Sequence, residues 1–423
     1  MAHGSEWYRL DNAAKVVPST MAGTDTRVFR LVCELKEKVD PAILQAALNE
    51  TLLEFPHMSC YLKRGIFWYY LNATDEVARV TEDSKAPLRN IYMPGRTNLL
   101  YRVSYYGRRI NVEFYHVLAD GTGGYIFLRS LVIHYFCEKY GMDPATMIKD
   151  TSSVDEKQSD AFSHFYEKKK SARKSLDILP KKAYQVRGVP DANVQSHLIE
   201  GNVSVKEMKT VAKQYGVTIG MLTTSLWVEA ILKTMDKNRY KEKIAVNVPV
   251  NLRQYFPSET TRNFFGVITV NYDPTHYDGT IESILPDISR EFKEQLTEDN
   301  IFRTMNSFAE LEHNWAVKMI PLFVKNAGVQ FVNHVISNGV TTSVSNVGKV
   351  DMPKEIAPYI DRFAGFMACR TVFIVIMTYG DNMNFGITSS FTKHRVAMNF
   401  FRRLTELGVH VEVATNDYDA EVK

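Results

Sequence analysis

The stretch NVEFYHVLADGTGG, residues 111–124, ends a strand-like apolar pattern on a histidine and continues at once into a glycine-rich turn. In an extended chain Val112, Phe114 and His116 point to one face, so the histidine continues an apolar surface. Most histidines in such places are buried side chains bonded to a carbonyl, but histidine is also the usual general base near neutral pH. Asp120 is expected to anchor the turn by an ion pair or backbone hydrogen bonds, and the glycines leave room for a ligand.

The first half of the chain predicts strands, hairpins and two helices. Residues 24–35 alternate apolar and polar side chains, which predicts a half-buried strand. Residues 39–56 predict a helix with Asp40 as N-cap. Its expected core-facing stripe is Ile43, Ala46, Ala47, Leu48 and Leu52. The other expected elements are strands at 65–71 and 98–106, a hairpin turning near Gly107, and a helix ending at Gly141.

The second half also mixes helices with strands. Ser204 and Glu207 have the spacing of a capping box at the start of a helix that ends at Gly216, and Thr218 is the expected cap of the next helix. The later elements expected are strands at 243–253, 264–273 and 339–348, a hairpin at 371–391 and a helix at 394–408. Mixed sheets with hairpins in both halves favour an α/β protein of the α+β type over a fold of repeated βαβ units.

A polar and strongly charged stretch, residues 150–190, separates the two halves and is the candidate linker. The expected division is a first domain over 1–175, a linker over 176–195 and a second domain over 196–423. The lysine run at 168–170 is expected to be a solvated face.

Composition narrows the class of protein. The chain has 51 basic and 48 acidic residues, a net charge of +3, which gives no reason to expect nucleic acid as a partner. Its four cysteines are far apart in sequence, so neither a disulfide framework nor a zinc site is expected. The start lacks the apolar core of a signal peptide, and no apolar run approaches the ~20 residues that span a bilayer, so a cytoplasmic location is expected.

The sequence HVLADG, residues 116–121, resembles the H-x-x-x-D-G motif of the chloramphenicol-acetyltransferase-like superfamily of CoA-dependent acyltransferases. Four further stretches are similar to characteristic family segments in the expected order: residues 39–62, 215–231, 246–256 and 343–348. The resemblance implies two similar α/β sandwich domains with mixed sheets and a tunnel between them.

The resemblance also implies roles for single residues. His116 would be the general base, and Asp120, before Gly121, would be structural and paired with Arg253. Without the family, Arg253 could equally be a surface arginine at a strand end. Ser345 and Asn346 would stabilise the oxyanion, although Ser-Asn-x-Gly by itself is a turn signal. The implied co-substrate is acetyl-CoA or another acyl-CoA with no metal, and the expected acceptor is a small alcohol or amine bound by a monomer.

The sequence departs from some branches of the superfamily. Tyr115 stands where condensation domains and wax ester synthases have the first histidine of H-H-x-x-x-D-G, and the chain has no copy of the plant-type D-F-G-W-G motif. The sequence is therefore most similar to stand-alone alcohol-acetyltransferase-like proteins. Two alternatives stay open: an enzyme that uses carrier-protein-bound thioesters, and a non-catalytic relative that binds a ligand.

Overall fold

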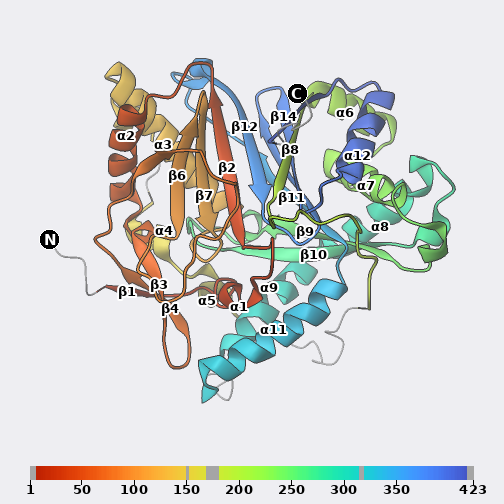
Figure 1. Cartoon of the computed structure of the whole chain (residues 1–423), viewed down its shortest axis with the longest axis horizontal. Helices are drawn as coiled ribbons and strands as arrows, with labels where there is room; N and C mark the ends of the chain where they lie inside the picture. The colour runs from red at the N-terminus through yellow and green to blue at the C-terminus, as the bar shows by residue number, and fades with distance from the viewer. Residues whose placement is uncertain (1–5, 149–151, 168–180, 314–318, 417–423) are drawn as a thin grey trace.

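The computed structural model describes residues 6–148, 152–167, 181–313 and 319–416. It contains two large sheets side by side with helices on their outer faces, so the expected α/β architecture with mixed sheets is confirmed (Figure 1).

The first sheet has five strands and a large apolar core. Their spatial order is β12 (Ile360–Met367), β2 (Val28–Leu35), β7 (Arg109–Tyr115), β6 (Tyr101–Tyr106) and β5 (Val80–Glu82). The helices α2 (Pro41–Glu54) and α3 (Gly121–Tyr140) pack on each other and cover its outer face (Figure 1). A separate small sheet is formed by β1 (Trp7–Arg9), β4 (Tyr69–Ala73) and β3 (Cys60–Arg64).

The second sheet has seven strands. Their spatial order is β10 (Phe265–Tyr272), β9 (Ile244–Asn251), β11 (Thr342–Lys349), β13 (Val372–Tyr379), β14 (Asn382–Ser389), β8 (His197–Ser204) and β15 (Glu412–Thr415). β11 runs parallel to both of its neighbours, and the other pairs are antiparallel. Its outer face is covered by α6 (Val205–Gln214), α7 (Ile219–Leu232), α8 (Leu285–Gln295) and α12 (Arg395–Glu406) (Figure 1).

The two sheets meet where β12 crosses β13 and β14. At this crossing a Cβ on Gly386 would lie 1.9 Å from the carbonyl oxygen of Gly365. Only glycine allows the two backbones to approach this closely. β12 belongs to the second half of the chain and yet completes the first sheet, so the first core depends on both halves. The division into domains at 1–175 and 196–423 stays a prediction.

Several elements differ from the sequence-based expectation. The strand β2 is buried along its whole length, not half-buried, because Arg30 pairs with Glu113 at 2.9 Å and Glu34 pairs with Arg108 at 2.6 Å. Ion pairing allows charged side chains to be buried. In α2 the buried residues are Leu44, Ala47, Leu48 and Thr51, so only two of the five expected stripe residues are fully buried.

Two local predictions need smaller corrections. The expected strand at 65–71 begins only at Tyr69, because the residues before it form the turn of the β3–β4 hairpin. Ser204 caps α6 as expected, but the capping box is incomplete, since Glu207 accepts a hydrogen bond from the backbone of His410.

Part of the charged stretch 150–190, the candidate linker, is folded. Residues 154–165 form the short helices α4 (Val154–Gln158) and α5 (Ala161–Phe165), and Phe162 is buried against Phe264. A few apolar side chains are enough to fix these helices, which average composition does not reveal. The lysines at 168–170 lie outside the described residues.

Two further helices lie near the open edge of the second sheet. They are α9 (Glu298–His313) and α11 (Leu322–Asn338), and α11 contacts the short α1 (Val17–Thr20) (Figure 1). In the described part of the chain no single helix is long and apolar enough to cross a bilayer; α6 and α7 reach that length only together, across a bend of 82°.

Candidate active site

His116 follows directly on β7 and faces a cavity between the two sheets. Its backbone N–H donates to the carbonyl of Arg27 at 2.9 Å, which continues the pairing of β7 with the start of β2. Its ring lies between Phe29 and Phe265, with ring centroids 5.3 and 5.6 Å away. The backbone and two aromatic rings thus hold the imidazole at the cavity wall.

The cavity has a volume of about 330 Å³ and is lined by strands of both sheets. Its wall is mostly apolar, with residues such as Leu31, Val267 and Phe373. Five of the six predicted site residues also line it: His116, Asp120, Gly121, Ser345 and Asn346. The structure therefore brings together residues that are more than 200 positions apart in sequence.

Asn263 fixes the tautomer of His116. Its Oδ1 lies 2.9 Å from His116 Nδ1, while its Nδ2 donates to Asp11 Oδ2 at 3.0 Å and to the carbonyl of His116 at 3.1 Å. Both acceptors of Nδ2 require the amide nitrogen on that side, so Oδ1 must face the ring. Because Oδ1 can only accept, Nδ1 carries the proton and Nε2 keeps a free lone pair.

The electrostatic surroundings favour the neutral imidazole. Burial lowers the pKa of His116 below its ordinary value, and Arg27 lowers it further, whereas Asp120 and the hydrogen bond to Asn263 raise it. Since burial is the largest cause, the net effect is a lowered pKa, which favours the neutral ring. A neutral ring with a free Nε2 is the form that can accept a proton.

Asp120 is structural in this geometry. Its Oδ1 caps α3 by accepting from Gly123 N at 2.8 Å, and its Oδ2 accepts from Phe264 N and from Arg253, each at 2.8 Å. The ion pair expected with Arg253 is therefore present. No acceptor oxygen of Asp120 is directed to His116 Nδ1, which is occupied by Asn263.

Arg253 holds the loop that carries Asn263. Besides Asp120, its guanidinium donates to the carbonyls of Thr260 and Arg262 at 2.9 and 2.7 Å. The side chain is only 10% exposed, so Arg253 is not the surface arginine that the residues alone would have allowed. Residues 260–264 are thereby fastened to the start of α3, where a Cβ on Gly123 would lie 1.8 Å from the carbonyl oxygen of Thr261.

The two candidate oxyanion donors differ in their surroundings. Ser345 lines the cavity, and among the described residues its hydroxyl has no hydrogen-bond partner. Asn346 is exposed and its Oδ1 accepts from Gly348 N at 3.0 Å, where β11 has a bulge. Ser345 is therefore the better placed of the two to donate a hydrogen bond into the cavity.

Sequence reasoning missed Asn263, Asp11 and Arg27. Asn263 lies in RNFFGV, residues 262–267, which is not a copy of the D-F-G-W-G motif, and Asp11 lies in a stretch near the N-terminus without a recognisable pattern. Arg27 lines the cavity and has a positive φ of 56°, a conformation that is costly for a residue with a side chain. Their roles depend on contacts between distant segments, which no local signal reveals.

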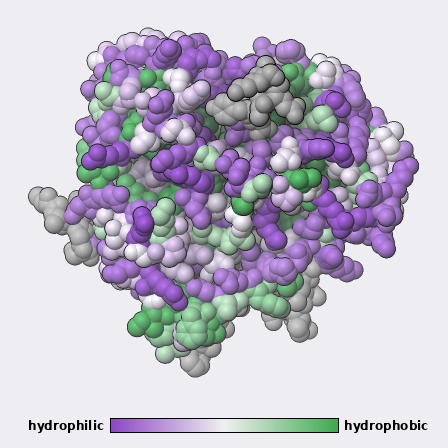
Figure 2. All heavy atoms as spheres, viewed as in Figure 1, coloured by the Kyte–Doolittle hydropathy of each residue, from purple (hydrophilic) through white to green (hydrophobic). Residues whose placement is uncertain are grey.

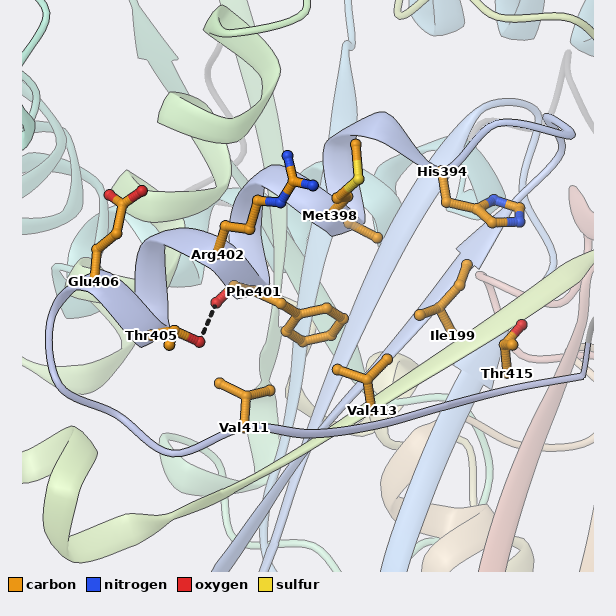
Figure 3. Close-up of a pocket in the computed structure, with 11 residues that line it drawn as sticks. Ile199, His394, Met398, Phe401, Arg402, Thr405, Glu406, Val411, Val413 and Thr415 are labelled. Carbon is orange, nitrogen blue, oxygen red and sulfur yellow. Dashed lines mark hydrogen bonds between the residues drawn. The ribbon is translucent and has the colours of Figure 1, made fainter.

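A larger cavity, about 630 Å³, lies between α12 and the strands β8 and β15. Figure 3 shows Phe401 of α12 pointing toward Ile199 and Val413. Among the described residues that line it, none is a predicted site residue. The cavity around His116 is the smaller one, but it is the one that holds an oriented base and a free hydroxyl.

Within residues 6–148, 152–167, 181–313 and 319–416, no group of three or more His, Cys, Asp or Glu side chains is arranged to hold a metal ion.

Comparisons with known proteins give the fold. No family model and no curated protein matches the sequence. The structure is similar to the TRI3 trichothecene 15-O-acetyltransferase from Fusarium sporotrichioides (TM-score 0.60, 12% identity, 95% of this chain and 94% of that chain). It is also similar to TRI101 from F. graminearum complexed with coenzyme A and T-2 mycotoxin (0.65, 12%, 96% and 100%).

A third similar structure is the first condensation domain of the calcium-dependent antibiotic synthetase with a substrate analogue (TM-score 0.60, 13% identity, 97% of this chain and 100% of that chain). The chain thus has the fold that acetyltransferases and condensation domains share, as its sequence motifs predicted.

Proposed function

We propose that this protein is an acyltransferase that moves an acyl group from acyl-CoA to a hydroxyl or amine of a small molecule, with His116 as general base. The observation on which this proposal rests most is the bond of His116 Nδ1 to Asn263, which leaves Nε2 of this cavity-lining residue available as a base. The fold shared with an acetyltransferase and with a protein complexed with coenzyme A supports the choice of donor.

The proposed reaction is direct transfer. The acceptor's oxygen or nitrogen attacks the thioester carbonyl carbon while His116 Nε2 takes its proton. The negative charge on the former carbonyl oxygen is stabilised by a hydrogen bond from Ser345. When the carbon–sulfur bond breaks, the imidazolium returns the proton to the departing sulfur, so the histidine ends the cycle neutral. No acyl-enzyme is needed.

In this mechanism Asn263 is a positioning residue. It holds the proton on Nδ1 before the reaction and accepts a stronger hydrogen bond when the ring becomes positively charged. Asp120 and Arg253 fix the loop at 260–264 to α3, and the charge of Asp120 also raises the pKa of His116. The apolar wall excludes water, which would otherwise compete with the acceptor.

The test is acceptor-dependent release of coenzyme A thiol. Acetyl-CoA and longer acyl-CoAs are offered with a panel of small alcohols and amines, and the mass of the acylated product is measured. Thiol release that requires an acceptor and yields its acylated product supports the proposal. Folded protein that is inactive with every acyl-CoA, but active with an acylated carrier protein, would assign the alternative donor instead.

A further inference from the structure

The helix α11 buries only Leu322 fully and turns several large apolar side chains toward solvent. Asn326 and Asn333, seven residues apart, lie on one face: Asn326 bonds Ser19 and Tyr69 at 2.7 and 3.0 Å, and Asn333 lines the cavity of His116. Phe323 and Phe331, eight residues apart, lie on the other face and are 65% and 70% exposed. An ordinary surface helix turns its large apolar side chains inward, so the exposure of these two phenylalanines is unusual.

The exposed face of α11 continues onto the β3–β4 hairpin. Leu322 N donates to the carbonyl of Ile66 at 2.9 Å, and Lys325 Nζ donates to the carbonyl of Phe67 at 3.1 Å. Ile66 and Phe67 at the hairpin tip are exposed. Figure 2 shows apolar atoms gathered at the lower edge of the molecule, where Figure 1 places this hairpin and α11. We call this surface the α11 patch; its members are Ile66, Phe67, Ile320, Phe323, Val324 and Phe331.

The charged side chains that the hairpin and α11 contribute beside the α11 patch are positive. The sequence has no acidic residue at 59–74 or at 313–350. Lys63 and Arg64 are exposed on the hairpin, and Lys325 lies 3.5 Å from the ring centroid of Trp68. The nearest acidic residues of the hairpin's sheet, such as Asp75, follow its far end.

These features select one kind of partner. An isologous dimer through the α11 patch would bring the same lysines and arginine together without a carboxylate between them. A bilayer with anionic lipids accepts apolar and aromatic side chains and attracts the cations around them. Large exposed apolar patches on soluble proteins mark sites that bind a protein, a ligand or a membrane, and the positive charges here favour the membrane.

We propose that the α11 patch docks on the surface of an anionic lipid bilayer, with α11 and the hairpin tip lying in the headgroup region and not spanning it. Asn333 and the adjacent α1 residues Val17 and Thr20 line the cavity of His116, so the docked face is next to that cavity. Docking would place the cavity beside lipid-dissolved molecules. The proposal does not depend on the acyltransferase reaction.

The experiment is co-sedimentation of the full chain with vesicles of equal parts phosphatidylcholine and phosphatidylglycerol. The test variant is the double substitution Phe323→Ser/Phe331→Ser. The matched control is Leu53→Ser, which removes an equally exposed apolar side chain from α2. Two phenylalanines that leave the bilayer should weaken partitioning at least about tenfold, whereas the control should bind like the wild type.

Further measurements distinguish an anionic bilayer from the other possible partners of the α11 patch. Binding to pure phosphatidylcholine vesicles should be weaker than to the mixed vesicles, and salt should weaken binding to the latter. A wild type that does not sediment with the mixed vesicles overturns the proposal. So does a wild-type dimer in light scattering that the double variant abolishes, since a second copy would then cover the patch. If the wild type does not bind vesicles and the double variant melts several degrees lower, another part of the same chain covers the patch, and the proposal is overturned.

Discussion

Replacing Asn263 with alanine tests whether this side chain sets the tautomer of His116. In the structure Asn263 Oδ1 is the acceptor for His116 Nδ1 at 2.9 Å. A hydrogen bond to the neutral ring is worth about 1 kcal/mol, and one to the charged ring about 1.5–3 kcal/mol. The difference is lost in the transition state. Together with the loss of the fixed tautomer, it should lower kcat/KM about 10- to 100-fold.

The pH profile gives a readout that a merely structural role would not move. The hydrogen bond to Asn263 raises the pKa of His116, so its removal should lower that pKa further. The acidic limb of kcat/KM should therefore move to lower pH in Asn263→Ala, even though the maximum is lower.

The matched control is Asn247→Ala. Asn247 also lines the cavity, but its Oδ1 accepts from Thr269 and not from His116. The control should keep the wild-type position of the acidic limb. An Asn263→Ala variant with kcat/KM within twofold of the wild type, or with an acidic limb at higher pH, would refute the assignment.

Three further predictions follow from the same contacts. Ser345→Ala should lower kcat about 10²–10³-fold, as expected for the loss of one oxyanion donor, while Asn346→Ala stays within about threefold; the reverse order would exchange their roles. Asp120→Ala leaves the guanidinium of Arg253 buried without its carboxylate and should cost about 3–5 kcal/mol in urea unfolding; a loss under about 1 kcal/mol would contradict the clamp. Burial lowers the pKa of His57 to about 3, so below pH 6.5 the unfolded chain binds a proton that the folded chain does not. As the pH is lowered from 6.5 to 4.5, the free energy of unfolding should decrease more steeply in the wild type than in His57→Asn, by about 1.4 kcal/mol per pH unit. Equal slopes in the two proteins would show that His57 is protonated in the folded protein.

Local signals in the sequence were reliable where one short segment decides the outcome. Asp40 and Thr218 cap the helices that they were expected to cap, and Gly141 ends α3 with a positive φ of 64°. The hairpins turn at Gly107 and Gly380, both with positive φ. Each of these depends on a hydrogen bond or a dihedral angle within a few residues.

Features that depend on distant partners were not predictable from local sequence patterns. The pairing of β12 with β2 joins residues more than 300 positions apart, and an alternating pattern identifies a strand but not its neighbour. The charged residues Arg30 and Glu34 suggested a half-buried strand, because their ion-pair partners Glu113 and Arg109 lie on another strand, β7.

The candidate site divides in the same way. His116, Asp120 and Gly121 stand in one motif, and Arg253 and Ser345 in two further family-like stretches. Asn263 is invisible in the sequence, because its importance comes from the fold of residues 260–264 against α3 and from Asp11 behind it.

The most direct test of the central claim is the rate of acyl transfer in His116→Ala beside the wild type, with the best acyl-CoA and acceptor pair. His276→Ala is the matched control, since this histidine is on the surface and pairs with Asp287. A general base contributes about 10²–10⁴-fold, so the His116 variant should lose at least a hundredfold in kcat/KM while the control keeps the wild-type rate. A folded His116→Ala that transfers the acyl group within a few fold of the wild type would contradict the account.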